Sequence, residues 1–84
     1  MAQTIKLLGS EVDIASASNV GFAKLVRVLN NKTSVQVITH KNSGGTTLAT
    51  VTLAAAEVAY IQKAPGDTLT GAATSLAVNV NFAN

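Results

Sequence analysis

The sequence predicts an all-β protein, built as a small antiparallel β-sandwich or barrel of about six to eight short strands. Apolar and polar residues alternate with a period of two in several runs, most cleanly in Ser75–Phe82. Clusters of Gly, Asn, Ser and Pro separate these runs at intervals of about ten residues. No run is followed by a convincing crossover helix, so a parallel sheet is not expected.

The first elements are short. Thr4–Leu8 and Glu11–Ala15 flank Gly9-Ser10, and we expect them to form a short hairpin. Ser16–Phe22 has the composition of a loop or an irregular edge. The chain is expected to be one domain over residues 1–84, in which residues 1–20 form an N-terminal arm or an edge hairpin.

The middle of the chain contains three runs with strand character. Lys24–Asn30 has apolar residues on both faces, as a central strand does, and Ser34–His40 follows after a polar turn. These two runs predict a β-hairpin. The segment Lys41–Gly45 is the strongest loop signal in the chain, and it leads into the β-branched run Thr46–Leu53.

The segment Leu53–Lys63 has signals of both helix and strand. Three consecutive alanines, a late lysine and Pro65-Gly66 beyond it are typical of a helix and its end. Val58, Tyr60 and Ile61 favour a strand, and no capping box begins a helix here. We expect a corner at the alanines, held by Glu57, followed by a strand over Glu57–Ala64.

Composition indicates a domain with a small core and a surface suited to protein contact. The chain has 84 residues, no cysteine and 12% charged residues, about half the usual charged share. A domain of this size without disulfides or a structural metal usually depends on idealised packing, oligomerisation or a partner. The scarce aromatics Phe22 and Phe82 are expected in the core, and Tyr60 either in the core or at an interface.

Catalytic chemistry has no support in the sequence, and we expect no enzymatic activity, no cofactor and no metal. His40 is the sole histidine, and neither Asp13 nor Asp67 has a spacing or motif that would make it a catalytic partner. Glu11 and Asp13 would share one face of a strand, where they could bind a cation weakly or, more simply, be solvated. Ser43–Thr46 lacks the lysine of a phosphate-binding loop and is most simply a hairpin turn.

Nucleic-acid and membrane partners are not expected either. The net charge of +2 comes from scattered basic residues that do not alternate with aromatics. The N-terminus lacks the pattern of a secretory signal, and no apolar run approaches the roughly 20 residues of a membrane span. The chain is expected to be made in a cytoplasm.

The stretch from Leu25 to Phe82 resembles small structural proteins of tailed bacteriophages, especially marine ones. The resemblance consists of an LVRVLN strand, a TLAAAE corner, and a strand that ends in Lys63-x-Pro65-x-Asp67-Thr68. Ala56 stands where that pattern has glycine, which argues against a corner with positive φ because alanine is strained there.

The resemblance implies a non-enzymatic virion protein, most simply one that decorates and stabilises the capsid. Its partners would be the major capsid protein or other virion proteins, and it would be a homo-oligomer or bound to the lattice. The alternatives are a small tail or head-fibre component and an adhesive or carbohydrate-binding β-sandwich on a particle surface. Tyr60, Gln62 and Lys63 are the expected contact residues.

Overall fold

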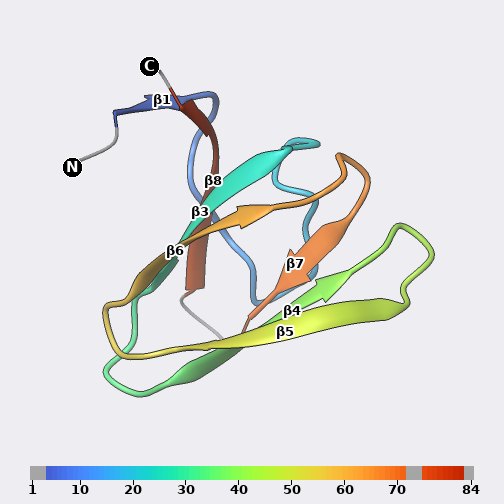
Figure 1. The fold of residues 1–84 in the computed structure, drawn as a ribbon. Helices are drawn as coiled ribbons and strands as arrows, with labels where there is room; N and C mark the ends of the chain where they lie inside the picture. The colour runs from blue at the N-terminus through green and yellow to red at the C-terminus, as the bar shows by residue number, and fades with distance from the viewer. Residues whose placement is uncertain (1–3, 72–74, 83–84) are drawn as a thin grey trace.

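The computed structural model describes residues 4–71 and 75–82, and these form eight strands in two antiparallel sheets (Figure 1). The predicted all-β class is confirmed, since the described residues form no helix. The strands are β1 (Ile5–Leu7), β2 (Val12–Asp13), β3 (Leu25–Asn30), β4 (Gln36–Lys41), β5 (Thr47–Leu53), β6 (Val58–Gln62), β7 (Thr68–Thr70) and β8 (Ser75–Phe82).

The larger sheet has the order β1-β8-β3-β6, and β2 also pairs with β8. Its central strand β3 alternates strictly between buried and half-buried residues, so that Val26 and Val28 face the other sheet. Arg27 pairs with Val78 on one side and Tyr60 on the other, so these residues share the outer face. The predicted strand Ser75–Phe82 is confirmed in full as β8.

The predicted N-terminal hairpin is wrong, because β1 and β2 both pair with β8 and not with each other. Leu7 lies opposite Val80 and Val12 lies opposite Ala77. The N-terminal segment therefore advances five residues while β8 advances three. The two extra residues bulge out around Gly9-Ser10. A Gly-Ser pair is compatible with a bulge as well as with a hairpin turn, so the local sequence does not distinguish the two.

The predicted hairpin between Lys24–Asn30 and Ser34–His40 is also wrong. β3 pairs with β6 and β8, whereas β4 pairs with β5 and β7, so the turn at residues 31–35 carries the chain from one sheet to the other. The local turn chemistry is the same in both cases, and only the distant strands decide the pairing.

The smaller sheet has the order β5-β4-β7. The hairpin turn predicted at Ser43–Thr46 is confirmed between β4 and β5, where the Asn42 side chain accepts hydrogen bonds from the N–H groups of Gly44 and Thr46. On the opposite edge, Ser18 forms an isolated bridge with Leu69 of β7. The β5 edge carries no such bridge among the described residues.

The segment with mixed helix and strand signals is a corner followed by a strand, as predicted. Residues 54–57 form a turn, and Glu57 anchors it by accepting a hydrogen bond of 2.7 Å from the N–H of Ala54. The argument against positive φ at this corner is wrong, because Ala56 has a φ of 62°. The strain at Ala56 is a local cost that the surrounding hydrogen bonds offset.

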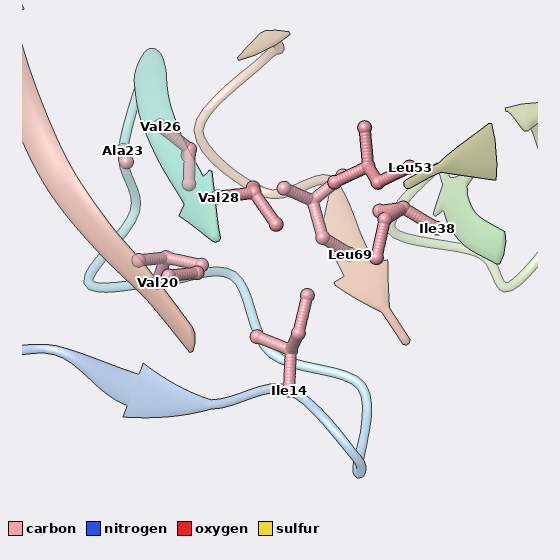
Figure 2. Packing of buried hydrophobic residues seen from close by; sticks show 9 residues of the cluster. Ile14, Val20, Ala23, Val26, Val28, Ile38, Leu53 and Leu69 are labelled. Carbon is pink, nitrogen blue, oxygen red and sulfur yellow. The ribbon is translucent and has the colours of Figure 1, made fainter. Parts of the chain in front are cut away.

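The core lies between the two sheets and consists mainly of valine, isoleucine and leucine. In Figure 2 the side chains of Val28 and Leu69 point toward each other across the sandwich. Ile14 enters from the N-terminal segment, where its N–H donates to the carbonyl of Ser75 at 2.9 Å. The full cluster is Ile14, Val20, Ala23, Val26, Val28, Ile38, Leu53, Leu69 and Ala77.

Candidate interaction surface

All three aromatic side chains of this chain are exposed. Phe22 is 67% accessible, Tyr60 47% and Phe82 40%. The prediction that Phe22 and Phe82 belong to the core is therefore wrong. Tyr60, expected either in the core or at an interface, lies on the surface. Aromatic residues are usually well buried, so three exposed ones in a small domain mark a surface of interest.

Phe22 is turned outward by a strained segment of backbone. Val20, Gly21 and Phe22 have consecutive positive φ values of 53°, 68° and 57°. A β-branched residue in this region is a true outlier, and such strain persists only when the surroundings impose it. Here the Asn19 side chain accepts the N–H of Phe22 at 3.2 Å, and Val20 packs in the core. The turn thus buries Val20 and exposes Phe22.

Tyr60 and Phe82 meet on the outer face of the larger sheet. Their ring centroids lie 6.0 Å apart, with an angle of 46° between the planes. Phe82 pairs with Ile5 and Val80 with Leu7, so β1 extends the same apolar face. This spacing and tilt are typical of a favourable aromatic pair.

We give the name aromatic surface to two groups of exposed side chains taken together: Leu7, Tyr60 and Phe82 around the aromatic pair, and Leu8 and Phe22 around a hollow. Leu8 and Phe22 line a shallow hollow of about 240 Å³ together with Leu25 and Val80. Leu7 lines a neighbouring hollow of about 290 Å³ beside Arg27 and Glu11, whose side chains form an exposed ion pair at 3.5 Å. The aromatic surface therefore includes two hollows, one lined in part by Lys24 and the other by the Arg27–Glu11 ion pair.

The predicted contact residues Tyr60, Gln62 and Lys63 have different environments. Tyr60 and Gln62 are exposed on the outer face of β6, but Lys63 is only 6% accessible. The Lys63 ammonium donates to the carbonyl oxygens of Ala23 at 2.7 Å and of Ala64 and Pro65 at 3.3 Å. Burial lowers the pKa of Lys63 below 10.5, and the nearby Asp67 carboxylate opposes this shift. Lys63 is thus a structural residue, and we leave it out of the contact surface.

Glu11 and Asp13 do not form a shared acidic face. Glu11 lies outside β2 and pairs with Arg27, while Asp13 accepts the N–H of Ala15 at 2.9 Å. Within residues 4–71 and 75–82, no group of three His, Asp or Glu side chains is placed to hold a metal ion.

His40 and Asp67 come together across 27 residues of sequence, which their spacing did not indicate. The His40 Nε2 atom lies 2.9 Å from an Asp67 carboxylate oxygen, and both side chains are largely buried. This pair has the arrangement of a base and an orienting carboxylate. No serine or threonine hydroxyl of the described residues is hydrogen-bonded to the His40 ring, so the pair ties β4 to the turn before β7.

A further apolar groove of about 280 Å³ is lined by residues of β5 and β6. These two strands diverge from the corner that joins them (Figure 1). Its walls are Ala49 and Val51 of β5 and Ala59 and Ile61 of β6. Ile38 and Leu69 are also among its lining residues, as is His40. Thr50 and Tyr60 complete the lining, so residues of both the β5 edge and β6 border this mainly apolar groove.

No part of the described chain forms a helix that is long and apolar enough to cross a membrane. No family model, curated protein or solved structure matches this chain. Any function therefore has to be inferred from these residues and their arrangement.

Proposed function

We propose that this protein is a non-enzymatic structural component of a bacteriophage virion, which docks on the capsid lattice through its aromatic surface and stabilises it. The observation that carries the proposal is the exposure of all three aromatic side chains. Aromatic residues dominate the binding energy of protein interfaces, where they fill pockets in the partner. Leu7 and Leu8 are exposed as well and add apolar area to that of the rings, which supports a contact with protein.

The low charge of the chain supports the same role. Only ten of the 84 residues are Lys, Arg, Asp or Glu, and those that line the two hollows of the aromatic surface are Lys24 and the ion pair Arg27–Glu11. The centres of protein interfaces are depleted in charge, because each unpaired charge there loses its hydration. The virion itself is suggested by the resemblance of the strand and corner motifs around TLAAAE, and a site on the tail or head fibre is the nearest alternative.

Two substitutions test the docking surface without disturbing the fold. Phe22→Asn provides a residue that tolerates positive φ, and Tyr60→Thr provides a β-branched residue that favours a strand. Each is expected to weaken binding to particles of the encoding phage that lack the protein by about 2 kcal/mol or more, which is about thirtyfold. Co-sedimentation with those particles measures the effect.

Val37→Thr is the matched control, since it removes an exposed apolar side chain from β4 of the smaller sheet. It should bind the particles as the wild type does. Equal binding by Phe22→Asn, Tyr60→Thr and the wild type would refute docking through the aromatic surface. Failure of the wild-type protein to bind particles would refute the proposed function itself.

A second candidate is an adhesive or carbohydrate-binding module, and the Tyr60–Phe82 pair favours it. Sugars stack on exposed aromatic rings, and this pair offers two rings within 6.0 Å. The two rings are tilted by 46° and so do not form one flat platform. Binding on a glycan array that is lost on Tyr60→Ala would favour this candidate over capsid docking.

A further inference from the structure

The β5 strand is an unguarded sheet edge. Among the described residues it pairs only with β4, and six of its seven residues are exposed. Its sequence, TLATVTL, contains no charged residue, no proline and no glycine. An edge of this length and composition is a template for pairing with another strand.

The other sheet edges carry the devices that usually prevent such pairing. β1 contains Lys6 and is three residues long, and β7 is bridged by Ser18. β6 has five residues and is shorter than β5. Short length, charged side chains and covering segments all block edge-to-edge contact. Among the described residues β5 is long, has no charged residue and has no segment bridged to its free side.

We propose that two copies of this chain associate by antiparallel pairing of their β5 edges around a two-fold axis at Thr50. A two-fold axis perpendicular to the sheet makes adjacent edge strands antiparallel, and it places each residue opposite its counterpart at equal distance from the axis. Thr50 then lies opposite Thr50 of the second copy, and Ala49 lies opposite Val51. The two three-stranded sheets become one six-stranded sheet.

This register matches both faces of the strand. Ala49 and Val51 line the apolar groove, so the pairing sets the same side chains of the second copy beside them on the same face of the sheet. Leu48 and Thr52 face outward and also lie opposite each other. A shift by one residue would set groove-facing side chains against outward-facing ones, so the apolar groove favours the symmetric register.

Charge at the two ends also favours a second copy as the partner. No like charges meet along β5, although the chain has a net charge of +2. In the proposed register the corner that carries Glu57 falls beside the β4–β5 hairpin of the other copy, which carries Lys41. The two elements that meet at each end of the paired strands therefore carry opposite charges, Glu57 at the corner of one copy and Lys41 on β4 of the other.

The pairing is expected to be weak, since a seven-residue strand spans only about 23 Å and contributes less than a standard interface. In a particle, many copies held side by side would raise its effective concentration. The pairing itself does not depend on the proposed virion role, and only the higher effective concentration in a particle does. The pairing uses the backbone of the β5 edge, which contains no residue of the aromatic surface, although Tyr60 also lines the groove beside that edge.

The test is sedimentation equilibrium of the full chain over a range of concentrations, with charge placed at the axis. Thr50→Lys sets two lysines opposite each other and should weaken dimerisation at least tenfold, and Thr50→Glu should do the same. An equimolar mixture of the two variants should restore the dimer, since a lysine would then face a glutamate across the axis. Val37→Lys puts the same charge on the exposed face of β4, away from the edge, and should dimerise as the wild type does.

A wild-type chain that stays monomeric at the highest attainable concentration would overturn the proposal. A dimer that persists in Thr50→Lys, or a mixture of the two charged variants that shows no recovery, would also overturn it. Circular dichroism of each variant establishes that the β fold is intact before sedimentation. If the dimer behaves as expected but the protein does not bind particles, the pairing stands and the virion role falls.

Discussion

The side-chain amide nitrogen of Asn30 donates a hydrogen bond to the carbonyl oxygen of Ala54 at 3.0 Å, across 24 residues of sequence. The same nitrogen lies 2.8 Å from the carbonyl of Ser34 and 3.2 Å from that of Leu53. Asn30 is fully buried, and its backbone also bonds to Ala56 and Glu57. One asparagine thus joins the crossing between the sheets to the β5–β6 corner.

Replacing Asn30 should be strongly destabilising. Asn30→Ala leaves buried carbonyl groups without donors, and we expect the free energy of unfolding to fall by about 2–4 kcal/mol. Asn30→Asp keeps the shape but places acceptor oxygens against acceptor oxygens, so it should cost at least as much. Urea denaturation measures both.

The neighbouring Asn31 provides the control, since it is exposed. Asn31→Ala should change the free energy of unfolding by no more than about 0.5 kcal/mol. Equal stability of Asn30→Ala and Asn31→Ala would show that the buried hydrogen bonds of Asn30 contribute nothing.

Ala56→Gly should stabilise the protein. The φ of 62° at Ala56 costs alanine about 1–2 kcal/mol, and glycine avoids this cost. Glycine also makes the unfolded chain more flexible, which offsets about 0.4–1 kcal/mol of that gain. The expected gain is about 0.5–1 kcal/mol in the free energy of unfolding, measured by thermal and urea denaturation. Ala55→Gly, one residue earlier, should only lose stability, and a gain there but not at Ala56 would contradict the assigned strain.

Gly71→Ala should be destabilising because no room exists for a methyl group. A Cβ at this position would lie 2.8 Å from the Ser75 Oγ and 2.9 Å from the Ile38 Cδ1. Overpacking of this kind costs about 1–3 kcal/mol. Gly9→Ala meets nothing within 4 Å and should stay within about 0.5 kcal/mol of the wild type. A lower melting temperature for Gly9→Ala than for Gly71→Ala would contradict this account.

The buried Lys63 predicts a pH dependence of stability. Burial lowers its pKa in the folded state below 10.5, so between the two pKa values the unfolded chain binds more protons than the folded one. Stability from this group therefore rises with pH through that window and levels off above 10.5. The free energy of unfolding of the wild type minus that of Lys63→Met should rise accordingly.

Asp67→Asn supplies the control for Lys63. The Asp67 carboxylate raises the pKa of Lys63, so removing it should lower the folded-state pKa further. The pH range over which stability rises should then be wider, and the rise in the free energy of unfolding larger. A difference that is flat with pH, or that falls as pH increases, would contradict the assignment of desolvation as the main cause.

Local patterns predicted the elements whose formation depends on neighbouring residues. The period-two run of β8 and the glycine-rich turn before Thr46 correspond directly to the structure. The corner at residues 54–57 also follows from local chemistry, because Glu57 reaches only three residues back to Ala54. In each case the interacting groups are close in sequence.

The wrong strand pairings and the missed His40–Asp67 contact involve partners that are distant in sequence, whereas the exposure of Phe22 comes from an unusual local backbone. The turn after Asn30 carries hairpin chemistry, but its asparagine bonds to carbonyls 23 and 24 residues away. Phe22 has the composition of a core residue, and only the left-handed backbone of residues 20–22 turns it outward. The His40–Asp67 contact likewise depends on the pairing of β4 with β7. Sequence alone contains no signal for these.

The most direct test of the virion role is quantitative mass spectrometry of purified virions from the phage whose genome encodes this chain. The account predicts that the protein is present in many copies per particle, and that a phage carrying Phe22→Asn and Tyr60→Thr together yields particles depleted of it. Urea denaturation of the purified double variant checks that it remains folded. Virions that lack the wild-type protein, or that retain the double variant at the wild-type copy number, would contradict the account.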